Sequence, residues 1–131
     1  MRILVVDDDY VSRVKLSRLL STYGHCDNAP NGDIAMSLFE CAHRESAPYN
    51  LVTMDVEMPA MNGQEVVMRM RAMEKSWATA RNLATKVLMV TAKESVKDVV
   101  SAYDEGCDGY LAKPIRPDRL IKALIEIGVK V

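Results

Sequence analysis

The chain has 131 residues, of which 17 are basic and 18 acidic, so its formal net charge at pH 7 is −1. A chain of this length can bury one hydrophobic core, but it is too short for a core and a separate substrate domain. The balanced charge provides no basic field for non-specific nucleic-acid binding, so nucleic acid is not an expected partner.

Short apolar runs alternate with longer segments of helical period, a pattern typical of βαβ units around a parallel sheet. Residues 3–6 are apolar at every position and predict a strand that is buried on both faces. Met1 and Arg2 leave no room for a signal peptide, and no apolar stretch approaches the length of a membrane span. A helix is expected next, with apolar positions at Val11, Val14, Leu19, Leu20 and Tyr23 and a stop at Gly24.

The sequence pattern of the second strand and helix is less clear. Residues 25–29 are short and polar, and they predict a strand that a sheet tolerates only at its edge. Asn31 and Gly32 form a turn before the second helix. The apolar positions of that helix are Ile34, Leu38, Phe39 and Ala42.

The middle of the chain contains two clearer strands. Residues 51–54 predict the third strand, which ends on Asp55. A helix is expected over residues 64–81. Residues 86–90 then predict the fourth strand, which ends on Thr91.

The final third repeats the scheme. A helix is expected with apolar positions at Val96, Val99, Val100 and Tyr103, and Gly106 closes it. Residues 110–112 predict a short fifth strand that ends on Lys113. The last helix carries its apolar stripe at Leu120, Ile121, Leu124 and Ile125.

The pattern therefore contains five strands and five helices. Because right-handed crossovers dominate parallel connections, these units favour an α/β, flavodoxin-like, doubly wound sheet of five parallel strands in the order 2-1-3-4-5. We expect residues 1–131 to form one domain without an output domain. Cys26, Cys41 and Cys107 are odd in number and lack metal-ligand spacing, which suits a reducing compartment, so a cytoplasmic location is expected.

Three aspartates, Asp7, Asp8 and Asp9, stand directly after the first predicted strand. Two carboxylates about 5 Å apart repel each other by roughly 3 kcal/mol at an effective dielectric constant of 20. A buried strand that ends in several carboxylates therefore predicts a compensating positive group. Candidates are a divalent metal, a lysine or a cluster of backbone amides.

Polar side chains also follow other strands, and the full set of strand-end residues is Asp7, Asp8, Asp9, Asp55, Thr91 and Lys113. In an open parallel sheet, ligands bind beyond the carboxyl ends of the strands where the strand order reverses, here between the first and third strands. Carboxylate oxygens suit Mg²⁺, and a carboxylate can accept a phosphoryl group as an aspartyl phosphate. A metal, a lysine and a hydroxyl donor are the groups that stabilise such a transfer.

Four motifs cover these strand ends in order: residues 5–8 (VVDD), 54–63 (MDVEMPAMNG), 90–92 (VTA) and 109–114 (GYLAKP). Together they resemble the receiver domain of two-component response regulators, in its single-domain CheY-like form. The resemblance covers about residues 2–128. It implies a stand-alone response regulator of a two-component phosphorelay, a phosphoprotein in signal transduction that catalyses only its own phosphorylation and dephosphorylation.

The resemblance also implies roles for the acidic residues. Asp55 would accept a phosphoryl group from a histidine kinase or a phosphotransfer protein. Asp7, Asp8, Asp55 and the backbone carbonyl of Glu57 would hold Mg²⁺.

The remaining motif residues would respond to the phosphoryl group. Lys113 would pair with its oxygens, next to a cis peptide bond to Pro114. Thr91 would donate its hydroxyl to it, and Tyr110 would move inward. This movement would change the face formed by the fourth helix, fifth strand and fifth helix, which would bind a downstream protein target. Neither nucleic acid nor a membrane is an expected partner, and the protein would be a monomer or a phosphorylation-dependent dimer.

Some residues have other predicted roles. Asp9 is expected to cap the first helix, because its carboxylate can accept a first-turn amide. His25 and His43 have no metal-ligand partners at useful spacing and are predicted to lie on the surface. Residues 74–85, which include Trp77, are long for the third helix and its loop in this family, and an extra helical turn is favoured over a partner-specific surface.

Two charges distinguish this chain. Glu57 stands two residues after Asp55, and Lys93 stands two residues after Thr91. In receiver domains, the side chains at these positions flank the route of the hydrolytic water. We hypothesise that Glu57 and Lys93 pair, partly cover the phosphoryl group and slow its hydrolysis.

Two other functions use the same residues. Asp7, Asp9 and Val11 fit the DxDx(T/V) signature of haloacid-dehalogenase-like phosphatases, which would make Asp7 the phosphorylated residue. That alternative leaves Asp55 and Gly63 unexplained. The second alternative is a receiver-like scaffold that binds a partner without phosphorylation.

Overall fold

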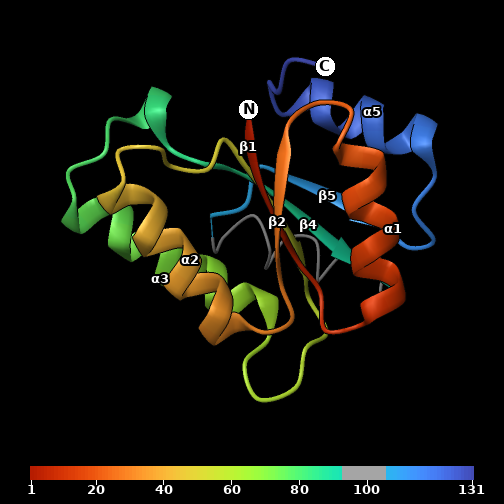
Figure 1. Cartoon of the computed structure of the whole chain (residues 1–131), viewed down its shortest axis with the longest axis horizontal. Helices are drawn as coiled ribbons and strands as arrows, with labels where there is room; N and C mark the ends of the chain where they lie inside the picture. Colours follow the sequence, from red (N-terminus) through yellow and green to blue (C-terminus); the bar gives the residue numbers. More distant parts are fainter. Residues whose placement is uncertain (93–105) are drawn as a thin grey trace.

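The computed structural model describes residues 1–92 and 106–131. Its strands are β1 (Arg2–Val6), β2 (His25–Ala29), β3 (Leu51–Asp55), β4 (Lys86–Thr91) and β5 (Gly109–Ala112). They form one parallel sheet in the order β2-β1-β3-β4-β5 (Figure 1). The predicted doubly wound sheet is therefore confirmed, and the polar strand β2 lies at its edge as expected.

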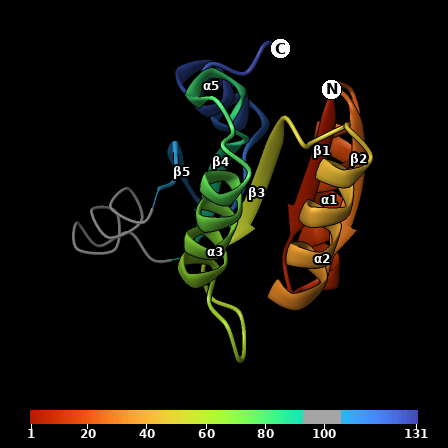
Figure 2. The same ribbon diagram turned by 90° about the vertical axis from the view of Figure 1, so that its left-hand side faces the viewer.

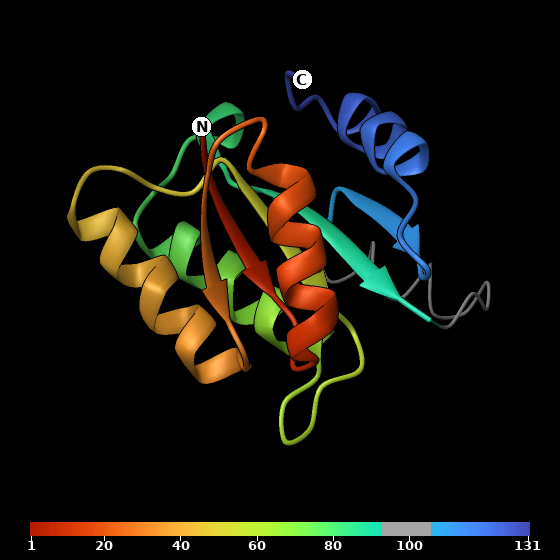
Figure 3. The same cartoon turned by 45° about the vertical axis from the view of Figure 1, so that its right-hand side comes forward.

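Helices cover both faces of the sheet. Helices α2 (Gly32–Arg44) and α3 (Gly63–Ser76) lie on one face, and Figure 2 shows both in front of the strands. Helices α1 (Tyr10–Leu20) and α5 (Pro117–Glu126) pack on the other face (Figure 3). The described residues thus include four α-helices where five were predicted, because the helix expected at Val96 to Tyr103 lies outside them. None of the helices in the described residues is long and apolar enough to cross a membrane.

Strand β1 shows why the core has two halves. Successive side chains of a strand point to opposite faces, so an apolar run fills both. Leu4 and Val6 pack with α2 and α3, whereas Ile3 and Val5 pack with α1 and α5. All four side chains are at most 1% exposed. The prediction of a strand buried on both faces is confirmed.

The helical stripes differ in detail from the prediction. In α1, Leu16 and Leu20 are buried, but Val11 is 70% exposed, because it lies on the first turn and points away from the sheet. In α2, Ile34 is also exposed at 41%. Helical spacing identifies a helix correctly here, but it does not decide which apolar positions near the helix ends reach the core.

Helix α3 is shorter than predicted. It ends at Ser76, and a separate 3₁₀ helix, η1 (Arg81–Leu83), precedes β4. The predicted extension of this helix to residue 81 is therefore wrong, and residues 74–85 contain the additional turn as the separate η1. Ala78 adopts a left-handed conformation, with φ 55°, just after the helix, and this conformation ends the α-helical hydrogen-bond pattern.

Candidate functional site

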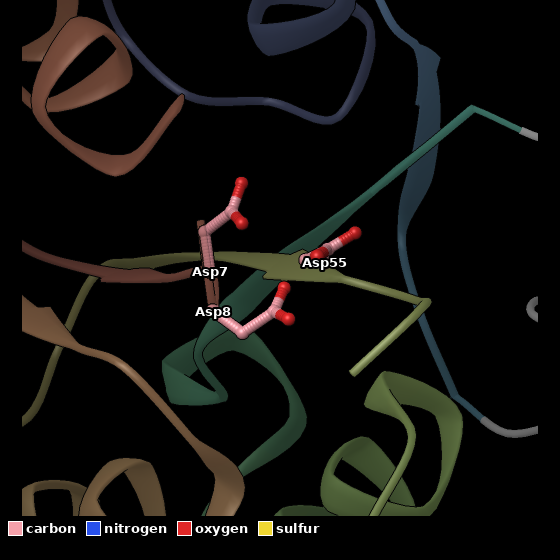
Figure 4. A group of neighbouring side chains, drawn as sticks. All are labelled: Asp7, Asp8 and Asp55. Carbon is pink, nitrogen blue, oxygen red and sulfur yellow. The ribbon is translucent and has the colours of Figure 1, made fainter. Parts of the chain in front are cut away.

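Three carboxylates meet where the central strands end. Asp7 and Asp8 follow β1, and Asp55 is the last residue of β3. Because β1 and β3 are adjacent and Val6 pairs with Met54, the three side chains lie together at one edge of the sheet (Figure 4). One carboxylate oxygen from each lies within 4.8 Å of the others. This is the convergence that the strand-end pattern predicts.

Lys113 supplies a positive charge to this cluster. Its Nζ atom lies 3.2 Å from Asp7 Oδ2 and 3.4 Å from Asp55 Oδ1. The Lys113 amide donates to the Thr91 carbonyl at 2.7 Å, and the peptide bond to Pro114 is cis, as the resemblance implied. Burial opposes the charge on Lys113, but the Asp55 and Asp7 carboxylates outweigh it and raise the lysine pKa.

Asp55 occupies an unfavourable position for an anion. Burial and the Asp7 carboxylate raise the pKa of Asp55 from 3.8 to about 7, although Lys113 acts in the opposite direction. Its Oδ1 atom is buried and accepts no hydrogen bond in the described part of the chain, so it has only the ion pair with Lys113. A buried carboxylate oxygen of this kind is under-coordinated. Together with the oxygens of Asp7 and Asp8, it is a donor set that fits a hard divalent cation.

Local hydrogen bonds orient Asp7. The Asp7 amide donates to the Ala29 carbonyl at 3.1 Å, and Asp7 Oδ1 accepts from the Asp9 amide at 2.9 Å. Arg13 donates from Nη1 to the Asp7 carbonyl at 2.7 Å. The sequence prediction missed Arg13, although its place one helical turn beyond Asp9 was a usable signal. Arg13 thereby ties the start of α1 to the residue that carries the first carboxylate.

Asp9 does not join the cluster. Its carboxylate caps α1 by accepting from the Ser12 amide at 3.1 Å and from the Ser12 hydroxyl at 2.7 Å. These two bonds lower the pKa of Asp9. The structure thus separates the three consecutive aspartates into two site residues and one helix cap, as predicted.

Thr91 and Glu57 lie beside the carboxylates. Thr91 ends β4 and is buried, and its hydroxyl donates to Oε1 of Glu57. The hypothesised partner of Glu57, Lys93, lies outside the described residues. Glu57 itself belongs to the loop between β3 and α3, which returns close to the sheet at Gly63. A Cβ at Gly63 would lie 2.1 Å from the Asp55 carbonyl oxygen, so only glycine fits there.

Tyr110 lies in β5 beside Met89 of β4. Its half-buried ring packs against the core between the sheet and the α2 and α3 helices. Its movement with Thr91 remains a prediction.

Comparison with known proteins identifies the family. The sequence model described as "Response regulator receiver domain" matches residues 3–125. The chain belongs to this family. A curated relative, the transcriptional regulatory protein TcrA of Mycobacterium tuberculosis, is 34% identical over 125 residues, which is 95% of this chain and 44% of TcrA. The receiver domain thus spans less than half of that relative.

Solved structures agree with this assignment. Chemotaxis protein CheY4 of Vibrio cholerae is 28% identical with a TM-score of 0.78, and the match covers 96% of this chain and 97% of that one. The receiver domain of the histidine kinase CKI1 from Arabidopsis thaliana, described as complexed with Mg²⁺ and BeF₃⁻, is 25% identical with a TM-score of 0.82. That match covers 96% of this chain and 88% of the CKI1 chain. The receiver domain described here therefore has the CheY-like fold of two-component signalling proteins.

The receiver domain contains a second polar cluster that the sequence prediction missed. Arg71 of α3 donates to the Gly106 and Thr85 carbonyls at 2.9 and 2.8 Å. It also donates to the carboxylates of Glu74 and Asp108 at 2.6 and 2.9 Å. These bonds tie α3 to the segments that precede β4 and β5. Their partners lie up to 37 residues away in the sequence, so helical spacing gave no signal for them.

His43 also differs from its prediction as a surface residue. Its ring stacks on the Trp77 indole, with ring centroids 3.8 Å apart and planes 4° apart, and it is half-buried. Phe39 lies close to the same indole, with centroids 5.8 Å apart. The stretch after α3 is therefore held against α2 by an aromatic stack.

Proposed function

We propose that this receiver domain accepts a phosphoryl group on Asp55 from the phosphohistidine of a histidine kinase or phosphotransfer protein, with Mg²⁺ as cofactor. The observation that carries the proposal is the buried Oδ1 of Asp55, which accepts no hydrogen bond in the described chain and lies 3.4 Å from Lys113. A carboxylate with an unsatisfied oxygen beside a lysine can accept a phosphoryl group as an aspartyl phosphate.

In the transfer, an Asp55 oxygen forms the new P–O bond while the P–N bond of phosphohistidine breaks and its electron pair returns to the imidazole. Asp7, Asp8, Asp55 and the backbone carbonyl of Glu57 are the residues that would hold Mg²⁺. The ion supplies charge neutralisation for the phosphoryl oxygens when it is bound. Lys113 is paired with Asp7 and Asp55. Its ammonium group is therefore close enough to pair with the oxygens of a phosphoryl group on Asp55. The described complex of the CKI1 receiver domain with Mg²⁺ and BeF₃⁻ supports this assignment.

Signalling would follow from the groups around the new phosphoryl group. Thr91 would turn its hydroxyl toward that group and Tyr110 would move inward, which alters the face that includes β5 and α5. A downstream protein would bind this altered face. We propose that the domain acts as a cytoplasmic regulator and that it is a monomer or dimerises on phosphorylation.

The test is phosphorylation of the purified protein with acetyl phosphate and MgCl₂, followed by peptide mapping. The expected adduct lies on the peptide that contains Asp55, and Asp55→Asn abolishes it. Asp33→Asn serves as the control, because Asp33 is an exposed acid in the first turn of α2. An adduct on Asp7 would instead support the phosphatase alternative, although Asp9 caps α1 rather than facing the cluster. If the folded protein forms no adduct at all, the remaining function is that of a scaffold that binds a partner without phosphorylation.

A further inference from the structure

The Thr91 hydroxyl donates to Glu57 in this structure. The contact follows from the strand pairing. Asp55 pairs with Val90, and the Val56 amide donates to the Val90 carbonyl at 3.0 Å, so the loop after β3 continues alongside the end of β4. Glu57 therefore arrives beside the buried Thr91. The Glu57 side chain is half-buried and so retains access to solvent.

This contact matters because a threonine hydroxyl has a single proton to donate. Glu57 offers a charged acceptor, and hydrogen bonds to ionised acceptors are roughly twice as strong as those between neutral groups. A phosphoryl group on Asp55 would be a second anionic acceptor close to the same hydroxyl. The two acceptors cannot both hold the Thr91 proton.

We infer that the Glu57 carboxylate is a positioning residue that competes with the phosphoryl group for the Thr91 hydroxyl and so opposes activation. This inference rests on the proposed function of Asp55. In the unphosphorylated protein, Glu57 holds the Thr91 side chain. On phosphorylation, Thr91 donates to the phosphoryl group, and Glu57 loses its donor beside a new negative charge. Its half-buried position lets it turn toward solvent. Glu57 therefore sets how strongly the phosphoryl group must attract the Thr91 hydroxyl before Thr91 donates to it instead of to Glu57.

The inference differs from the hypothesised pair of Glu57 and Lys93. That pair would act by covering the phosphoryl group and slowing its loss. Competition for Thr91 acts on the equilibrium between the two arrangements, even with a ligand that does not hydrolyse. The two ideas therefore predict different measurements.

The test is the affinity of the full chain for beryllofluoride, a phosphoryl analogue, at fixed Mg²⁺ by isothermal titration calorimetry. Glu57→Ala removes the acceptor, and Glu57→Gln keeps an acceptor without the charge. Thr91→Val removes the donor and keeps the shape. With Thr91 present, Glu57→Ala is expected to tighten binding about tenfold, the scale of one charge-assisted hydrogen bond, and Glu57→Gln by less. In the Thr91→Val variant, Glu57→Ala should tighten binding by less, because only the loss of the negative charge then acts on the affinity.

The control is Glu65→Ala, which removes a negative charge from the first turn of α3. The Glu65 side chain is 44% exposed and pairs with Arg69 at 3.1 Å, so its loss should leave the affinity unchanged. Circular dichroism checks that each variant is folded, and unfolding of the metal-free proteins provides a second cycle. Glu57→Ala and Thr91→Val should give non-additive changes in stability because each of them removes one partner of the same hydrogen bond.

The outcomes are distinguishable. If Glu57→Ala changes the affinity equally with Thr91 and with Val at position 91, or the stability changes add, the competition is wrong while the proposed function stands. If the wild-type protein binds no beryllofluoride and acetyl phosphate leaves Asp55 unmodified, the proposed function is wrong and the competition falls with it.

Discussion

Thr53 offers a direct test of how buried polar groups affect the stability of this domain. It lies in the middle of β3 between Val5 of β1 and Leu88 of β4, and it is 1% exposed. Its hydroxyl has no hydrogen-bond partner in the described part of the chain. The hydroxyl therefore loses its hydration on folding without a replacement. Thr53→Val keeps the shape of the side chain and removes that cost.

The expected gain follows from the cost of leaving a buried hydroxyl unpaired, about 1–3 kcal/mol. We expect Thr53→Val to raise the free energy of unfolding by about 1–2 kcal/mol. At about 2.1 cal/mol/K of unfolding entropy per residue, 1 kcal/mol corresponds to about 4 °C in Tm for a chain of this length. The melting temperature should therefore rise by about 4–8 °C.

Thr85 is a matched control. It is also buried, at 3% exposure, but its hydroxyl donates to the Tyr49 carbonyl at 2.7 Å. The same substitution at Thr85 removes a made hydrogen bond and should lower the stability by about 1 kcal/mol. Urea unfolding followed by circular dichroism, in EDTA, measures both changes. The reasoning is refuted if Thr53→Val destabilises the protein, or if the two variants shift the midpoint in the same direction.

Three other perturbations test the site and the core. Because burial and Asp7 raise the pKa of Asp55 from 3.8 to about 7, the folded state binds a proton more tightly than the unfolded chain, and stability falls as the pH rises between these values. In EDTA, Asp55→Asn should therefore stabilise the protein more at pH 8 than at pH 4, and an equal effect at both would contradict this. Gly63→Ala should cost about 1–3 kcal/mol in urea unfolding, since its Cβ would lie 2.1 Å from the Asp55 carbonyl oxygen, and an unchanged midpoint would argue against that contact. Ellman's reagent should modify the exposed Cys41 in the native protein, whereas Cys107, which is buried with its pKa raised to about 11, should react only on unfolding.

Much of the fold was predictable because buried strands have a recognisable hydrophobic pattern in the sequence. Strands covered on both faces must be apolar at every position, and residues 3–6 and 51–54 are nearly so. The polar segment at residues 25–29 was correctly limited to an edge, where β2 lies. Helix ends were less predictable. Helix α3 stops at Ser76 because the chain turns there, and no residue between 77 and 80 marks that turn with the expected glycine.

The site was predictable to the extent that it depends on strand ends. Parallel strands deliver their last residues to one edge, so Asp7, Asp55 and Lys113 had to approach each other once the strand order was known. The pairing of Glu57 was not predictable in the same way. Opposite charge suggested Lys93, which lies outside the described residues, whereas nothing in the sequence pointed to the Thr91 hydroxyl, which donates to Glu57.

The sequence by itself determined the order of the elements, the chemical groups at each strand end and the division of Asp9 from its two neighbours. Only the tertiary structure decided which groups share a hydrogen bond. Arg71 illustrates the difference, because three of its partners come from the two segments that precede β4 and β5, which lie beside α3 only in the folded chain. Periodicity reports how each segment faces the core, whereas a hydrogen bond depends on positions within a few tenths of an ångström that packing alone sets.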